Sequence, residues 1–107
     1  MPRASREAGF RLRVVVWAKK LRVAPRQIRI QPMTRKWASC SATGRVTFSR
    51  ELLHKPHDFQ TYVIVHELLH LRLANHGKLF RASLRAHLGH NRWLARSVPS
   101  ASRQRDQ

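Results

Sequence analysis

The chain has 107 residues, a hydrophobic fraction of 42% and a net charge of +17, with 22 Lys and Arg against 5 Asp and Glu. This length predicts one compact domain, and the absence of an apolar run of membrane-spanning length excludes an integral helical membrane protein. Cys40 is the single cysteine, which excludes an intrachain disulfide and is typical of a reducing compartment, so we predict a cytoplasmic protein. The charge favours non-specific contact with nucleic acid or another polyanion, although a solvated basic surface without a dedicated partner explains it equally well.

The ends of the chain are expected to differ from its middle. Residues 1–9 are expected to form a disordered lead-in, and residues 97–107 have the composition of a disordered basic tail. A single domain is therefore predicted at residues 10–96. Its first element, residues 10–23, has apolar spacing that fits a helix only in part and also fits a short strand of valines. The Ala-Pro pair that follows ends this element.

Two short strands are expected next. Residues 27–33 alternate the apolar Ile28 and Ile30 with polar neighbours, a pattern typical of a strand with one buried face. Residues 34–43 are rich in small polar side chains and are expected to form a loop. Residues 45–50 alternate again, and we expect the two strands to pair antiparallel.

Two helices are expected in the second half of the chain. The first is predicted to begin at Pro56 and to run to about Leu73, with residues 62–71 apolar almost all round and therefore buried. A break is expected at residues 74–77. A second helix is predicted at residues 78–88, ended by a glycine and followed by a short turn.

The first of these helices carries the sequence His66-Glu67-Leu68-Leu69-His70. Two histidines four residues apart lie on one face of a helix, so both imidazoles can bind one metal ion. Glu67 points away from that face and can take a proton from a water molecule bound to the metal. The alternative is a hydrogen-bonded pair of core histidines beside a surface acid. Burying these polar groups in an apolar helix is costly unless a metal satisfies them, which favours the metal site.

A catalytic zinc site needs a third protein ligand. A glutamate on a following helix is nearly excluded, because the only acid after Glu67 is Asp106 near the end of the chain. The remaining candidates are His76, His87, His90 and Cys40. On an unbroken helix His76 would point away from the two motif histidines, but the expected break lets the chain turn back, so we favour His76.

Four segments together resemble a known family: residues 28–30 (IRI), 36–41 (KWASCS), 62–71 (YVIVHELLHL) and 75–80 (NHGKLF). In order and spacing they resemble the YgjP-like metallopeptidase domain, a family related to SprT-like proteases and minimal zincins. The resemblance covers roughly residues 14–94. Ala38 stands where the family usually has Gly, Gly77 stands where a Ser commonly caps the second helix, and longer members carry more sequence at the N-terminus.

The resemblance implies an α+β, zincin-like fold. In that fold a small antiparallel sheet packs against an N-terminal helix and the buried motif helix, and a second helix follows. It also implies one zinc ion bound by His66, His70 and His76, with Glu67 as the general base. A role beside the site is implied for a loop that contains Trp37, Ser39, Cys40 and Ser41.

Three functions remain in competition at this point. The leading hypothesis is a zinc metallopeptidase acting on a peptide or protein substrate. The second is metal-dependent hydrolysis of another anionic substrate, such as a nucleotide phosphoanhydride, which the basic surface would favour. The third is a non-catalytic zinc-stabilised module that binds nucleic acid. Glu67 argues against the third hypothesis, because a structural zinc site needs no acid beside its ligands.

Overall fold

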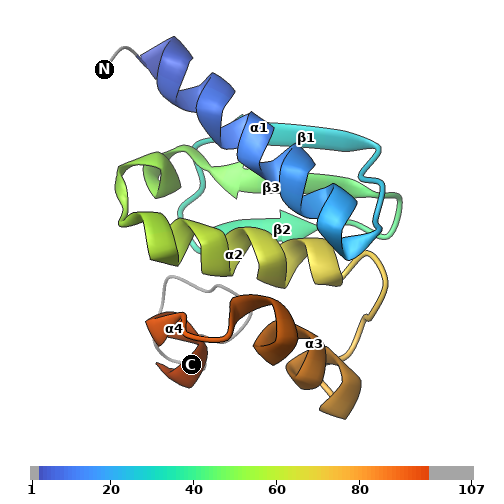
Figure 1. Ribbon diagram of the computed structural model, residues 1–107. Coiled ribbons are helices and arrows are strands. Elements are labelled where there is room, and N and C mark those ends of the chain that lie inside the picture. The colour runs from blue at the N-terminus through green and yellow to red at the C-terminus, as the bar shows by residue number, and fades with distance from the viewer. Residues whose placement is uncertain (1–2, 97–107) are drawn as a thin grey trace.

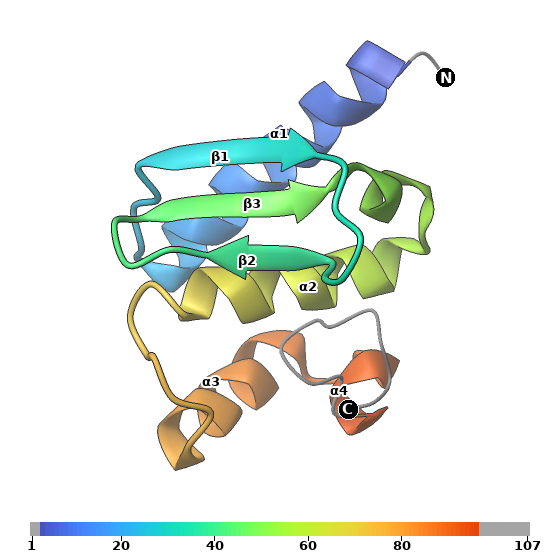
Figure 2. The same cartoon turned by 180° about the vertical axis from the view of Figure 1, so that it is seen from behind.

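The computed structural model describes residues 3–96 of the chain, which form an α+β fold (Figure 1). The elements in chain order are α1 (Arg3–Leu21), β1 (Gln27–Gln31), β2 (Ala38–Cys40), β3 (Arg45–Ser49), the 3-10 helix η1 (Arg50–His54), α2 (His57–Leu69), α3 (Lys78–Leu88) and α4 (Arg92–Arg96). Helices α1 and α2 lie against one face of the sheet, and α3 and α4 lie on the far side of α2 (Figures 1 and 2). Within residues 3–96 no helix has the length and hydropathy to cross a membrane. The predicted α+β class is confirmed.

The sheet is mixed rather than antiparallel, which corrects the expected pairing. Its strand order is β1-β3-β2. β1 pairs with β3 in parallel, with Ile30 opposite Phe48, while β2 pairs with β3 antiparallel. The expectation failed because an additional strand lies between the two predicted ones in the sequence. The chain runs out along β1, back along β2 and out again along β3, so the first and last strands point the same way.

That additional strand, β2, lies inside the segment expected to be a loop. Its three residues are small, and only Ala38 is fully buried. Its ends are fixed by main-chain bonds from Ser49 N to Trp37 O (2.8 Å) and from Ser41 N to Arg45 O (2.9 Å). So short a strand of small side chains has no hydrophobic alternation to reveal it, and pairing with β3 decides its conformation.

Helix α1 begins at Arg3, so the expected disordered lead-in is wrong for residues 3–9. Contacts distant in sequence hold these first turns: Glu7 forms an ion pair with Arg50, and Arg6 hydrogen-bonds His54 of η1. Local sequence patterning does not reveal such partners. The expected tail at residues 97–107 lies outside the described residues.

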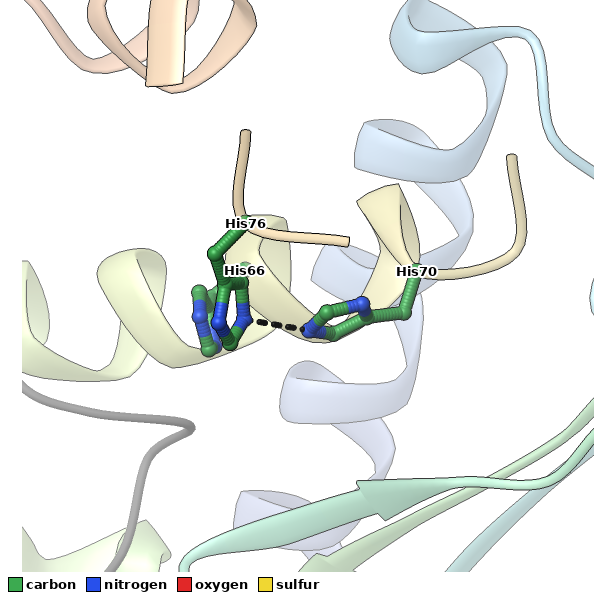
Figure 3. A group of neighbouring side chains, drawn as sticks. All are labelled: His66, His70 and His76. Atoms are coloured by element: carbon green, nitrogen blue, oxygen red, sulfur yellow. Dashed lines mark hydrogen bonds between the residues drawn. The ribbon is translucent and has the colours of Figure 1, made fainter. Parts of the chain in front are cut away.

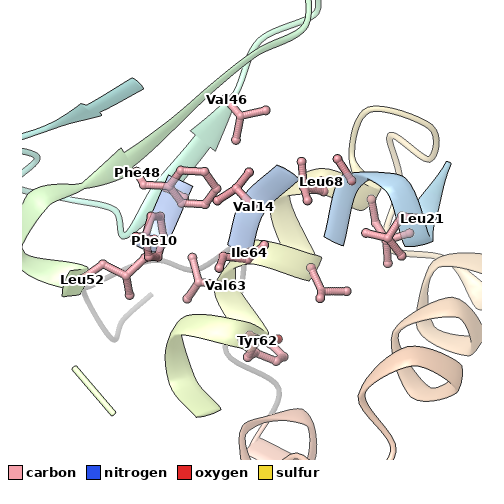
Figure 4. Close-up of a cluster of buried hydrophobic side chains, with 14 of the residues drawn as sticks. Phe10, Val14, Leu21, Val46, Phe48, Leu52, Tyr62, Val63, Ile64 and Leu68 are labelled. Carbon is pink, nitrogen blue, oxygen red and sulfur yellow. The ribbon is translucent and has the colours of Figure 1, made fainter. Parts of the chain in front are cut away.

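One hydrophobic core joins the sheet to α1 and α2 (Figure 4). Val14 of α1 and Val46 of β3 are fully buried, and the rings of Phe10 and Phe48 meet edge to face with centroids 5.1 Å apart. Ile64 and Leu68 of α2 are also fully buried in this core. Helix α2 therefore lies at the centre of the domain, where packing fixes its position on several sides.

Candidate metal centre

Helix α2 fixes the first two polar groups of the site. Ten of its 13 residues are buried, including His66 and Glu67, which are 2% and 3% exposed. Helices that are apolar all round pack on every side, so a polar side chain on such a helix has little freedom to move. His66 and Glu67 are therefore held by the packing of their apolar neighbours.

The end of α2 brings the chain back toward these residues. The helix ends at Leu69, four residues earlier than expected, and His70 forms its C-cap. The amides of His70, Leu71 and Arg72 each bond the carbonyl three residues before, which tightens the chain into a turn. The predicted break therefore starts earlier, and the chain reverses before the second helix, whose N-cap is Gly77.

Three imidazoles converge at this reversal. One ring nitrogen from each of His66, His70 and His76 lies within 4.8 Å of the others. His70 Nε2 and His76 Nε2 are 2.9 Å apart, and Figure 3 marks this contact between the two rings with a dashed line. The exposure of the three residues increases from the buried His66 to the exposed His76. The cluster therefore opens toward solvent on one side, as a catalytic metal site requires.

The donor set fits a zinc ion. His70 Nδ1 lies 3.2 Å from the carbonyl oxygen of Leu73, which orients the ring as main-chain oxygens orient metal-binding histidines. His66 Nδ1 is buried and has no hydrogen-bond partner among the described residues, and the nearest carboxylate oxygen, Glu67 Oε2, is 3.4 Å away. A buried polar nitrogen without a partner is rare unless a ligand satisfies it. Three imidazole ligands are a known catalytic set for zinc.

Aromatic rings enclose the cluster. Phe80 of α3 packs against all three imidazoles, with centroid distances of 5.3, 4.8 and 4.8 Å to His66, His70 and His76. Tyr62 stacks on His66 from one turn before it, at 5.6 Å. Phe80 belongs to the segment 75–80 that carries part of the family resemblance, but its contact with the histidines was not predicted. The closeness of Phe80 to His76 along the chain was the available signal.

The electrostatics of the site follow from burial and from the charge on Glu67. Burial, with a smaller effect from the two neighbouring histidines, lowers the pKa of His76 and favours the neutral imidazole that binds metal. Burial and then the charge of Glu67 raise the pKa of Tyr62 to about 12. The same two causes raise the pKa of the Cys40 thiol. Glu67 is thus close enough to act on groups from both α2 and β2.

The other candidate ligands lie apart from the cluster. Within residues 3–96, the only group of three His, Cys, Asp or Glu side chains arranged to hold an ion is the histidine trio. His87 lies on α3 with its ring against Trp17, at 6.4 Å, and His90 is exposed beyond Gly89. Cys40 is half-buried on β2. Of the four alternatives for the third ligand, His76 is the one that the fold places beside the motif.

The segment that contains Trp37, Ser39, Cys40 and Ser41 was expected to be a loop beside the site. It forms strand β2 and the residues on either side of that strand, next to α2 (Figure 1). The ring of Trp37 packs edge to face against Phe59 of α2, at 5.5 Å. Ser39 lies in β2 opposite Thr47, and Ser41 Oγ accepts a hydrogen bond from the amide of Arg45. Ala38, the residue that replaces the usual Gly, is in an extended strand and needs no positive φ.

Comparison with curated proteins finds no match for this chain. The family model described as "YgjP-like, metallopeptidase domain" matches residues 3–97, nearly the whole length. That match, which agrees with the resemblance seen in four sequence segments, implies a metal-dependent hydrolase, and the three clustered histidines are a set able to hold its ion. The chain belongs to the YgjP-like metallopeptidase family.

Proposed function

We propose that this protein is a zinc-dependent peptidase in which His66, His70 and His76 hold the ion and Glu67 is the general base. The observation that carries the proposal is the convergence of three imidazoles beside a buried carboxylate. A zinc ion bound there would lower the pKa of a water molecule to about 7 and polarise the carbonyl group under attack.

The role of Glu67 rests on its position. Its carboxylate belongs to the residue next to His66 and lies 3.4 Å from that ring at Oε2, beside the ligands without belonging to the cluster of three. A carboxylate there can accept the proton of the attacking water and later pass it to the leaving amine. A purely structural zinc site has four protein ligands and no use for such a base.

The edge of the sheet offers a place for the substrate. β2 pairs only with β3 among the described strands. The bonds at Trp37 and Ser41 point toward β3, so by antiparallel alternation the main-chain groups of Ala38 and Cys40 face the outer edge. An extended peptide can pair with such an edge as an added strand. We propose that the substrate binds there, beside α2, with its scissile bond near the histidines.

Hydrolysis of a casein-like unfolded protein by the purified chain tests the proposal. Glu67→Gln should retain zinc and lose about 10²–10⁴-fold in rate, because the amide cannot accept the proton. Glu51→Gln, which changes an exposed acid on η1, is the matched control and should keep full activity. Equal activity of the Glu67→Gln variant and the unchanged protein would contradict the assignment of the base.

The same preparation separates the competing functions. Hydrolysis of a nucleoside triphosphate without cleavage of any protein substrate would favour the phosphoanhydride hypothesis. Zinc retention with no hydrolysis of either substrate would favour the non-catalytic module. Zinc-dependent cleavage of protein, lost on chelation and restored by zinc, is the result that our proposal predicts.

A further inference from the structure

The face of the sheet turned away from α1 and α2 is not covered by any described helix (Figure 2). Ile30 and Phe48 point to the helices and are buried, so the residues beside them in β1 and β3 point to this open face. Arg29 and Arg45 lie on it and are exposed. The open face is therefore polar and carries positive charge.

A groove of about 540 Å³ adjoins this face where β1 and β3 begin, lined by Arg26, Gln27, Thr43 and Arg45. The Arg45 side chain is held by a hydrogen bond from its Nε to Gln27 Oε1 at 3.1 Å, and the main chain at Arg26 is fixed by a bond from its amide to the carbonyl of Gly44 at 2.8 Å. Gly44 has a φ of 98°, and a Cβ there would lie 3.0 Å from Arg26 Cγ. Glycine thus permits both the turn and the close approach of the Arg26 side chain.

Acidic groups are absent from this part of the sequence. No Asp or Glu occurs between Glu7 and Glu51, a stretch that includes the whole sheet. Among the described acids, Glu7 pairs with Arg50, and Asp58 pairs with Arg92 at the start of α4. Neither guanidinium of the groove has an ion-pair partner within the described residues. An anion from outside the chain would therefore meet uncompensated charge.

We propose that this groove and the adjoining sheet face bind the phosphate backbone of a nucleic acid. Guanidinium groups match phosphate oxygens with paired hydrogen bonds, and hydroxyl and amide side chains such as Thr43 and Gln27 supply further donors. Arg29 lies on the same face beyond the groove, so a chain with repeated phosphates can contact all three arginines. The groove has no aromatic side chain to stack on a base. The contacts that we propose are with phosphate, and phosphate contacts carry no information on base sequence.

The polar lining distinguishes this partner from a membrane. Insertion into lipid needs exposed apolar side chains beside the cations. The exposed large hydrophobic side chains of the described residues belong to α1 and α3, and none lies on the sheet. The open face of the sheet also lies opposite α2, the helix that carries His66, so binding there leaves the proposed catalytic site open (Figures 1 and 2).

Fluorescence anisotropy with a labelled 20-base-pair DNA duplex and the full chain tests the inference. Arg26→Glu/Arg45→Glu should weaken binding by at least about tenfold and lower the slope of log K against log salt by about 2, since each phosphate contact contributes about 0.9. The matched control is Lys78→Glu/Arg85→Glu, an equal charge reversal at exposed positions of α3. It should weaken binding by less than about threefold.

Circular dichroism verifies folding, and the milder Arg26→Gln/Arg45→Gln variant replaces the double reversal should that variant fail to fold. Equal losses in the groove variant and in the α3 control would overturn the inference, because binding would then reflect net charge alone. Absence of duplex binding in low salt would overturn it as well. Tighter binding to poly-glutamate or to anionic vesicles than to the duplex would do the same.

Discussion

Helices α2 and α3 both border the histidine cluster, but their surroundings differ. Helix α2 buries ten of its 13 residues, whereas α3 buries only Phe80, Leu84 and Leu88 of its 11. The first is packed on all sides, and the second rests on one apolar stripe. The hydrophobic core therefore fixes the position of the α2 side chains, whereas a single line of contacts fixes the position of α3.

The two helices also contribute different residues to the site. The buried helix contributes His66 and Glu67, and His70 lies at its C-cap. The exposed helix contributes only the Phe80 ring, and His76 comes from the segment between the two helices. We infer that the proposed base and the proposed ligand His66 are held rigidly, while the proposed third ligand, His76, depends on the turn and on α3.

The largest expected effect is a loss of zinc affinity. It tests whether His66 and His70, at the end of α2, can hold the ion without His76. His76→Ala should lower zinc affinity by more than about 100-fold, since even loss of a group that only orients a ligand costs about 10–100-fold. Competition with a chelating dye measures it. His90→Ala, which alters an exposed histidine outside the cluster, is the control. Unchanged affinity in His76→Ala, with loss in His90→Ala, would contradict the assignment.

The next effect compares the packing of the two helices directly. Leu68→Ala in α2 removes a fully buried side chain and should lower the free energy of unfolding by about 2–5 kcal/mol. Leu79→Ala in α3 changes a side chain that is 65% exposed, so the free energy should stay within about 0.5 kcal/mol. Urea unfolding of chelated protein measures both. Similar losses in the two variants would contradict the difference in packing between α2 and α3.

A smaller effect is expected on the pKa of the Cys40 thiol in β2, which the buried charge of Glu67 in α2 helps to raise. Burial and the charge of Glu67 raise the pKa of the Cys40 thiol, so less thiolate forms at a given pH. In zinc-free protein, the reaction of Cys40 with a disulfide reagent should reach its midpoint at a higher pH than in the unfolded chain. Glu67→Gln removes one cause and should shift that midpoint downward. No shift would show that the carboxylate does not act on β2.

The smallest expected effect lies at the start of α3. Gly77 caps this helix without a side-chain hydrogen bond, and nothing lies within 4 Å of the position of an added Cβ. Gly77→Ser would supply a hydroxyl acceptor and should raise the free energy of unfolding by a few tenths of a kcal/mol. Thermal unfolding with Gly77→Ala as control measures the change. If Gly77→Ala raised the free energy of unfolding as much as Gly77→Ser, capping would be ruled out as the cause.

The sequence predicted which histidines converge better than it predicted the sheet. The convergence of His66 and His70 follows from helical spacing alone, and that of His76 from the break that lets the chain reverse. Both are local properties, and helix geometry converts them directly into positions. The outer contacts, such as the carbonyl of Leu73 behind His70, depend on a turn that begins earlier than the apolar pattern indicated.

Strand direction and the start of α1 depend on partners far along the chain. The parallel pairing of β1 with β3 follows from β2, a strand of three small residues with no alternating pattern. Helix α1 extends to Arg3, and Glu7 in its first turns pairs with Arg50, 43 residues away. Local patterning carries no information on such pairs, so these features were not predictable from the sequence.

The central claim is one ion held by three imidazoles with one position left for water. Zinc K-edge X-ray absorption of the purified protein tests it most directly. We predict one zinc per chain with three imidazole nitrogens at about 2.0–2.1 Å and one further oxygen ligand. A sulfur ligand at about 2.3 Å, a fourth protein ligand, or a folded protein that binds no zinc would contradict the account.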